Sequence, residues 1–336
     1  MPDRRGRLAN YATLGLLTLI WGTTWAAIRV GLRGIPPFTG VALRFAIAAA
    51  ALLAVAPALG VRLRGAAAVP AAGAMPPVQG GAPGSAGSAG SAAPGLPWRV
   101  WLVNGLMTFF IPYGVLYWAE QWVPSGLAAV LFATSPLWVA LAAHLALPAE
   151  RLRAATAAGV LVGFAGVAVI FSEDLRALGG PRVVGAAAVL LLSPLCSAVG
   201  VVAVKRWGAG VPPLSVAAVP MALAAAAMGC VAWFAERGQP LRFAGWPLVA
   251  LLYLALCGSA LSFTLYFWLL GRLPATSLSL INYLIPIVAL TIGGTALGES
   301  FTARTLAGSA LVVGGVAVAM RARGGRPAGA ASRRRS

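Results

Sequence analysis

Two stretches of this chain, PSGLAAVLFATSP at residues 124–136 and PATSLSLINYLIP at residues 274–286, decide how it folds. Each begins and ends on a proline, and the second follows the first at an offset of 150. The match extends over the longer segments 117–171 and 267–320, apart from a one-residue deletion. An apolar pattern that occurs twice predicts an internal structural repeat.

The front of the chain is repeated as well, at an offset of 176. Arg29 corresponds to Lys205, and the double proline at 36–37 corresponds to the one at 212–213. The two offsets differ because only the first copy carries a stretch rich in Gly, Ala, Ser and Pro, residues 70–97. Such a composition cannot bury enough apolar surface to order itself, so we expect a disordered cytoplasmic insert.

Long apolar blocks predict an all-α integral membrane protein. The chain is 60% hydrophobic and 10% charged, whereas soluble domains carry about 25% charged residues. A helix that crosses the bilayer needs about 20 predominantly apolar residues. We predict ten transmembrane helices, at residues 11–31, 37–58, 99–119, 124–146, 154–172, 183–204, 213–235, 246–270, 274–297 and 302–321.

These spans divide into two sets of five, within residues 8–176 and 180–322. Because each set has an odd number of spans, the second must enter the membrane from the opposite side. The sequence therefore predicts two inverted five-helix repeats. Inverted repeats around a shared site are one known basis for alternating access in transporters.

The net charge of +18 is distributed as in a membrane protein. With the N-terminus inside, most of the 25 basic residues fall in the inside segments, as the positive-inside rule requires. We therefore predict that both termini are cytoplasmic and that the basic tail, residues 323–336, rests near anionic lipid headgroups. This distribution favours the lipid bilayer as a partner and argues against nucleic acid.

The chain lacks a motif for a metal, a nucleotide or another cofactor. Its three cysteines, Cys196, Cys230 and Cys257, fall within predicted spans without metal-ligand spacing, and we interpret them as packing residues. An intramembrane lipid-modifying enzyme would need Asp, His or Cys residues converging near the interface, and these are missing. We predict no enzyme activity; a channel-like or non-transporting membrane scaffold is the alternative to a carrier.

Four short motifs suggest a family by their order and spacing. LIWGTTW at 19–25 and LRF at 43–45 open the chain, and LGE at 297–299 precedes a glycine-rich segment at 308–315. This arrangement resembles EamA-type members of the drug/metabolite transporter superfamily, over residues 11–321. The resemblance implies a ten-helix secondary transporter, usually an exporter of small metabolites, amino acids or drugs, in the inner or plasma membrane. The shortage of lysine beside abundant Ala, Gly and Arg is typical of a GC-rich bacterial genome.

The second copy departs from the pattern of the first. The position that corresponds to Trp21 is Ser197, and the position that corresponds to Arg44 is Pro220. Whether the two halves contribute equally to a pore therefore stays open.

Pro136 and Pro286 are the first candidates for a substrate site. Each lies 12 residues into its predicted span, which at 1.5 Å per residue is near the bilayer midplane. Proline removes one helical hydrogen bond and frees the carbonyl four residues earlier. With Ser135, Asn282 and Tyr283 as polar neighbours, we predict a substrate-binding lining; a kink that only shapes packing is the alternative.

Trp21, Thr23 and Thr24 form a second group near mid-membrane. Tryptophan normally gathers at the membrane interfaces, so a central one suggests a flat wall for a substrate. The two hydroxyls would supply weak ligation. Aromatic and hydroxyl groups suit a small amphipathic or zwitterionic molecule; ordinary helix packing is the alternative.

Arg44 is the basic residue that falls clearly inside a span, and it needs a partner there. Glu120, at the end of the third span, lies in the same half of the membrane in this topology. We predict an Arg44–Glu120 ion pair that acts as an outer gate or holds the outward end together. The alternative is that Arg44 snorkels to the outer headgroups.

Other polar and small residues suggest supporting roles. Glu150 and Glu299 precede the last span of each half and are predicted to cap a helix N-terminus. His144 could relay protons, but proton coupling, exchange and facilitated diffusion all stay open. Gly159 and Gly163 form a small-residue pair that permits close helix packing, either within the chain or across a homodimer.

Overall fold

The computed structural model describes residues 4–61, 63, 97–146, 154–171, 180–208, 210–270 and 281–324. Throughout this part of the chain all regular structure is helical, as the sequence predicted. Nearly all of the predicted insert 70–97, most of the tail 323–336 and Glu150 lie outside the described residues.

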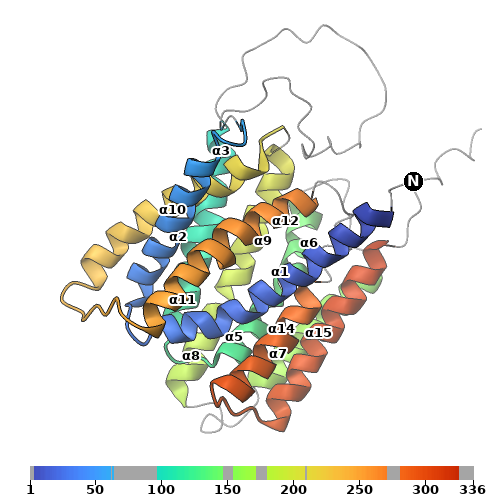
Figure 1. Ribbon diagram of the computed structural model, residues 1–336. Helices are drawn as coiled ribbons and strands as arrows, with labels where there is room; N and C mark the ends of the chain where they lie inside the picture. Colours follow the sequence, from blue (N-terminus) through green and yellow to red (C-terminus); the bar gives the residue numbers. More distant parts are fainter. Residues whose placement is uncertain are drawn as a thin grey trace, which may run out of the picture.

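The helices follow one another in a bundle (Figure 1). In chain order they are α1 (Arg4–Gly31), α2 (Pro37–Val55), α3 (Trp98–Asn104), η1 (Gly105–Phe110), α4 (Ile111–Ala119), α5 (Ser125–Phe132), α6 (Ser135–Ala146), α7 (Ala154–Phe171), α8 (Pro181–Leu190), α9 (Leu192–Trp207), α10 (Pro213–Ala235), α11 (Trp246–Ala255), η2 (Leu256–Leu261), α12 (Ser262–Leu270), α14 (Ile281–Ala296) and α15 (Ala303–Gly324).

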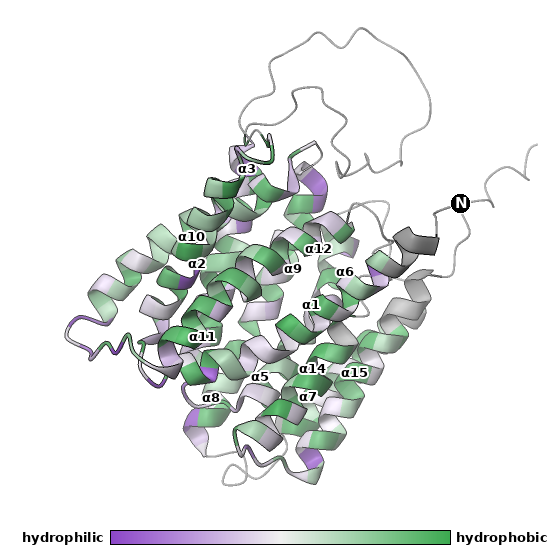
Figure 2. Cartoon of the chain, viewed as in Figure 1, coloured by the Kyte–Doolittle hydropathy of each residue, from purple (hydrophilic) through white to green (hydrophobic). Residues whose placement is uncertain are grey.

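Seven helical stretches within the described residues are long and apolar enough to cross a membrane. They are Ala9–Gly31, Pro37–Val55, Trp98–Ala119, Ser125–Ala146, Pro181–Trp207, Pro213–Ala235 and Trp246–Tyr266. Three shorter apolar helices, Ala157–Ile170, Leu284–Ala296 and Ala303–Val318, lie where the remaining three spans were predicted. The chain is therefore an α-helical membrane protein, while the count of ten spans stays a prediction. Hydrophilic residues gather at the helix ends and in the turns (Figure 2).

Prolines set the starts of several helices. Pro37, Pro181, Pro213 and Pro247 each occupy the first or second position of their helix, and Pro124 is the N-cap of α5. Proline is well suited to the first turn because its missing N–H would have no helical partner and its φ is already helical. The matching double prolines at 36–37 and 212–213 thus reappear as matched helix starts, at α2 and α10.

Two π-helical segments interrupt corresponding spans. η1 lies between α3 and α4, and η2 lies between α11 and α12. Short π-helical segments within α-helices frequently occur at functional sites. Gly258 and Ser259 of η2 both take part in the candidate site described below.

The glycine-rich helices α7 and α15 pack directly against each other (Figure 1). A Cβ on Gly166 would lie 2.6 Å from the carbonyl oxygen of Gly308, and a Cβ on Gly315 would collide with the backbone of Gly163 and Gly159. Only glycine permits so close an approach. The order of these contacts makes the two helices antiparallel. The predicted small-residue contact therefore forms within the chain, between its two halves.

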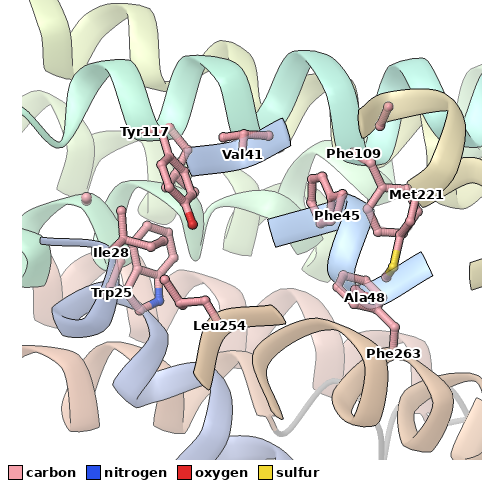
Figure 3. Packing of buried hydrophobic residues seen from close by; sticks show 14 of the residues in the cluster. Trp25, Ile28, Val41, Phe45, Ala48, Phe109, Tyr117, Met221, Leu254 and Phe263 are labelled. Atoms are coloured by element: carbon pink, nitrogen blue, oxygen red, sulfur yellow. The ribbon is translucent and has the colours of Figure 1, made fainter. Parts of the chain in front are cut away.

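Many further helix pairs join the two halves, and the three with the most extensive contact are these. α2 packs along α10, α1 packs against α14, and α6 packs against α9. The buried core lies between these pairs and contains residues of both halves. Figure 3 shows Trp25, Ile28 and Tyr117 close to Leu254 in one group, and Phe45, Ala48 and Phe109 close to Met221 and Phe263 in another.

Candidate functional site

Arg44 is a buried cation that connects the two halves of the chain. It lies on α2, and only 1% of its surface is exposed. Its Nε donates to Ser259 Oγ at 2.8 Å, and its Nη2 donates to the Gly258 carbonyl at 3.1 Å. Its Nη1 donates to the Tyr117 hydroxyl at 3.3 Å. The guanidinium thus links α2 and α4 of the first half with η2 of the second.

Aromatic rings cover the Arg44 guanidinium. Its Cζ lies 4.8 Å from the centroid of the Tyr113 ring and 5.6 Å from that of the Phe45 ring, both within cation–π range. A charge inside a membrane span needs partners of this kind. Because Arg44 is buried among them, it does not snorkel to the headgroups.

The predicted ion pair between Arg44 and Glu120 is not formed. Glu120 follows α4 and is 0% exposed, yet neither of its carboxylate oxygens has a hydrogen-bond partner among the described residues. The reason is geometric, since the nitrogens of Arg44 are directed at η2 and at Tyr117. The prediction of a direct pair was wrong, and Arg44 acts on this carboxyl only at longer range.

The surroundings of Glu120 disfavour its ionised form. Glu120 lies one residue beyond the span Trp98–Ala119. Burial raises the pKa of its carboxyl well above the usual range of glutamate, while Arg29 lowers it, Glu299 raises it and Arg44 lowers it. The position at the C-terminus of α4 adds the negative end of a helix dipole. Burial thus favours the protonated form of Glu120 more than it would be favoured in an exposed glutamate.

Arg29, at the end of α1, holds the turn between α4 and α5. Its Nη1 donates to the backbone carbonyl of Glu120 and, at 3.4 Å, to that of Val123. Free carbonyls at the C-terminus of a helix are natural partners for a cation. Arg29 therefore binds the backbone carbonyl of Glu120 and not its carboxylate oxygens.

Glu299 caps a helix at this same end of the bundle. Its Oε1 accepts the backbone N–H of Ser125 at 2.7 Å, and its Oε2 accepts that of Gly126 at 3.1 Å. These are the first residues of α5, and a helix N-terminus favours an anion. The predicted capping role of Glu299 is confirmed, although the capped helix belongs to the other half of the chain.

Glu236 caps α2 in the same way. Its Oε1 and Oε2 accept the backbone N–H groups of Phe38 and Thr39, each at 2.7 Å, and Oε2 also accepts the Thr39 hydroxyl at 2.6 Å. Sequence reasoning missed Glu236; the available signal was its place directly after a long apolar span, near a proline-started helix. We call this end of the bundle, comprising residues 32–36, 120–124, 236–245 and 297–302, the capped end.

Trp21 presents an unused donor inside an aromatic cluster. Its ring centroid lies 5.3 Å from that of Tyr266 and 5.6 Å from that of Phe263, both on α12 of the second half. The indole Nε1 is buried and has no hydrogen-bond partner within the described part of the chain. A buried N–H without a partner is uncommon in proteins. The arrangement could therefore receive an acceptor atom of a ligand.

The two threonines after Trp21 differ in their surroundings. Thr23 Oγ1 shares a short hydrogen bond with the Tyr253 hydroxyl of α11 and also donates to the Ile20 carbonyl at 2.8 Å. Thr24 Oγ1 donates to the Trp21 carbonyl at 2.7 Å, within its own helix. Thr23 thus links the two halves, whereas the Thr24 hydroxyl satisfies local backbone.

Pro136 and Pro286 are both buried in the bundle. The helix is interrupted before Pro136, between α5 and α6, whereas Pro286 lies inside the continuous helix α14. The two prolines predicted an interrupted helix in both halves. The interruption is present beside Pro136 in the first half and absent at Pro286 in the second. Ser135 is half-buried beside Pro136; the side chains of Asn282 and Tyr283 lie outside the described residues.

Sequence reasoning also missed several partners in this region. Tyr117, Tyr253 and Gly258 each contact a predicted residue from another helix. They carried no sequence signal beyond polarity or small size within a span. His144, considered as a proton relay, is exposed in the last turn of α6.

Comparison with known proteins identifies the family. The model of the EamA-like transporter family matches residues 11–172 and again residues 185–321. These two matches together cover most of the chain, which therefore belongs to the EamA-like transporter family.

Individual relatives are distant but cover most of the chain. Protein PagO of Salmonella typhimurium is 26% identical over 278 residues, which are 82% of this chain and 81% of PagO. The uncharacterized inner membrane transporter YedA of Escherichia coli K12 is 27% identical over 307 residues, 89% of this chain and 86% of YedA. One crystal structure shares the fold with a TM-score of 0.62 at 24% identity, over 93% of this chain and 96% of the other.

Proposed function

We propose that this EamA-family chain is a secondary transporter that exports a small molecule by alternating access between two inverted five-helix repeats. The observation that carries the proposal is the buried indole N–H of Trp21, which has no hydrogen-bond partner in the described part of the chain. Its aromatic walls, Phe263 and Tyr266, come from the other half of the chain. A ligand held there would contact both repeats, so its binding would respond to their relative movement.

Reciprocal packing supports the inverted repeats. Gly159 and Gly166 correspond in sequence to Gly308 and Gly315. Gly166 packs on Gly308, while Gly315 packs on Gly159, so each glycine meets the counterpart of the other. Such exchange of contacts is typical of two units related by a twofold axis. The antiparallel course of α7 and α15 is what inversion of one repeat would produce.

We propose that the other binding residues lie near Trp21. Trp21 would donate to the substrate and provide a flat wall, with Thr23 beside it at the contact between α1 and α11. We assign the remaining lining to residues that the sequence predicted, namely Thr24, Ser135, Pro136, Asn282, Tyr283 and Pro286. The close packing of Gly22 in α1 against Val288 in α14 supports this assignment, because it brings these two helices together.

The chemistry of these residues favours one class of substrate. An aromatic wall binds a flat or apolar face, and the indole N–H binds a carbonyl or carboxylate oxygen. Arg44 is held by three hydrogen bonds, so it contributes positive potential rather than a free docking group. We therefore infer a small amphipathic or zwitterionic molecule, such as an amino acid, rather than a polyanion.

The orientation of the chain follows from charge. We infer that both termini are cytoplasmic and that the capped end faces outward, because most basic residues then lie inside. A relative in Escherichia coli is named as an inner membrane transporter, which favours the same membrane for this chain. Export is the direction that we propose for net flux.

A counterflow assay tests the proposal. Proteoliposomes that contain the full chain are loaded with one amino acid, purine or cationic drug, and uptake of the labelled compound is followed over time. A carrier gives saturable, transient accumulation with at least one compound. Flux that rises linearly with concentration would indicate a channel, and absence of flux for the whole panel would contradict the proposal.

A further inference from the structure

Three carboxylates lie at the capped end. Two of them meet helix N-termini, and the third lies at a helix C-terminus. Glu236 and Glu299 accept backbone N–H groups at the N-termini of α2 and α5. Glu120 follows the C-terminus of α4, where backbone carbonyls present negative charge. Two of these carboxylates are therefore stabilised as anions by the helix ends that they meet, and the third is not.

The cations near Glu120 are already engaged by other groups. Arg44 donates to Ser259, Gly258 and Tyr117, and the Nη1 of Arg29 donates to backbone carbonyls. Both Glu120 oxygens are fully buried and, among the residues that the structure describes, have no hydrogen-bond partner. A buried carboxylate without partners is strongly disfavoured, and it takes up a proton instead.

The same turn holds a second unsatisfied group. The Ser125 hydroxyl is buried and has no hydrogen-bond partner among the described residues, although its backbone N–H is bound by Glu299. Among the described residues, Tyr117 on α4 and Glu299 are the other titratable groups whose charge acts on Glu120. Arg182 on α8 lies over the Trp122 ring at 5.9 Å. None of them provides a direct counter-ion to the carboxylate.

We propose that Glu120 is a proton-binding site that controls the capped end. One proton from the outer compartment converts the carboxylate to the acid when the end closes, and the acid returns it when the end opens to water. The inference rests on the proposed alternating access, since it assumes that the capped end opens. Nothing else is transferred, so the proton is the only ligand of the site.

The direction of the effect follows from linkage. The closed conformation binds the proton more tightly than the open one, because only the open one hydrates the carboxylate. Closure is therefore favoured as pH falls. This advantage is lost as pH rises through the pKa that Glu120 has in the closed conformation. For one proton, the closed-to-open ratio changes by at most about tenfold per pH unit.

Infrared difference spectroscopy tests the proton site without any substrate. The full chain in lipid nanodiscs, labelled with ¹³C-glutamate, is titrated between about pH 9 and about pH 6, which stays above the ordinary glutamate range. We expect an acid C=O band that is absent in Glu120→Gln. The matched control Glu236→Gln removes a carboxylate of the same end whose oxygens are paired, and it should keep the band. Absence of the band from the unaltered chain would overturn the proposal, even if the variant failed to fold.

Distance measurements test the link to opening. Spin labels at Gln121 and Ser300, both exposed, report the separation between the α4–α5 turn and the α14–α15 turn in a chain whose cysteines are replaced by alanine. We expect the short distance to gain population as pH falls and Glu120→Gln to stay short at every pH. Glu120→Asp keeps a carboxyl and should keep the response. If the distance in Glu120→Gln still responded to pH as in the unaltered chain, the proposal that Glu120 controls opening would be refuted. If the expected distances were observed but the transport assay failed, only the transporter proposal would be refuted.

Discussion

The two halves of the chain are alike where α7 meets α15 and unlike around Arg44. At α7 and α15, each half contributes the same glycines to the same reciprocal contact. Around Arg44, the corresponding positions have different chemistry, with Pro220 matching Arg44, Leu270 matching Glu120 and Phe267 matching Tyr117. The backbone packing is thus shared between the halves, whereas Arg44, Tyr117 and Glu120 have no polar counterpart at the matching positions of the second half.

This difference has a consequence for the two ends of the proposed pathway. The capped end is held by Arg29, Glu236 and Glu299, which bind backbone groups across helices. In the second half the equivalent of Glu120 is an apolar leucine. We therefore expect the two ends to open with unequal free energies and unequal sensitivity to pH. The predictions below test this inequality, from the largest effect to the smallest.

Substitution of Arg44 should have the largest effect. Arg44→Met removes the group that binds Ser259, Tyr117 and the Gly258 carbonyl, and leaves these buried polar atoms unpaired. We expect transport to be lost and the free energy of unfolding to fall by about 3 kcal/mol. Melting in detergent and counterflow in proteoliposomes measure the two effects.

Pro220, which matches Arg44 in the second half, provides the control. Pro220→Ala restores a helical residue in α10 without removing a buried polar partner, so its effect should be much smaller than that of Arg44→Met. Arg44→Lys keeps the charge but not the planar set of donors, and it should fall between the two. Equal losses for Arg44→Met and Pro220→Ala would contradict the asymmetry.

Substitution of the packed glycines tests the region where the halves agree. Gly166→Ala would place a Cβ 2.6 Å from the Gly308 oxygen, and Gly315→Ala would place one against the backbone of Gly163. Because backbone cannot move aside easily, we expect each variant to lose about 1–3 kcal/mol, and by similar amounts. Thermal melting in detergent gives the comparison.

Gly314 is the matched control for this pair, since a Cβ there meets nothing within 4 Å. Gly314→Ala should be neutral or stabilise the chain by up to about 1 kcal/mol, because alanine favours the helix. If Gly314→Ala were as harmful as Gly315→Ala, the loss would come from the helix itself rather than from contact between the halves.

Removal of the Trp21 donor should weaken substrate binding without breaking the fold. Trp21→Phe keeps an aromatic wall and loses the unpartnered N–H. A hydrogen bond of about 1 kcal/mol corresponds to a roughly fivefold weaker affinity. The half-saturation concentration in counterflow, with whichever compound is transported, measures it. Ser197→Ala, at the matching position of the second half, should change affinity by less than about twofold; a larger change there would show that the halves share the site equally.

The sequence predicted the helical class and the placement of most spans because proline and hydrophobic length determine both locally. Pro37, Pro124 and Pro213 begin or precede helices in the structure as the repeat implied. The close packing of the glycines was also predictable, since small residues at matching positions have few other uses in a membrane helix.

Side-chain partners were less predictable, because they depend on how helices rotate about their axes. Arg44 was expected to meet Glu120, but its rotation directs it at Ser259 on η2. The π-helical turn that presents Gly258 and Ser259 has no clear sequence signal. The capping carboxylate of α2, Glu236, is 198 residues away from Phe38 in the chain, so no local pattern could pair them.

The smallest predicted effects concern the two capping carboxylates. Glu299→Gln and Glu236→Gln each keep one acceptor oxygen but remove the charge that the helix N-terminus favours. Because glutamine keeps an acceptor oxygen, we expect losses of about 0.5 kcal/mol, at the lower end of the range measured for N-caps. Glu236→Gln should lose more, because Glu236 also binds the Thr39 hydroxyl. Ser300→Ala, an exposed neighbour of Glu299, is the control for both in melting experiments.

These two caps run in one direction, from the second half to the first, so their loss should act on the opening of the capped end and not on the contact between α7 and α15. The distance between labels at Gln121 and Ser300 should therefore lengthen in Glu299→Gln, while a cross-link between α7 and α15 should form as efficiently as before. Loss of that cross-link would mean that the caps stabilise the whole bundle. In that case the two ends would not differ in the way that the polar groups around Arg44 and Glu120 indicate.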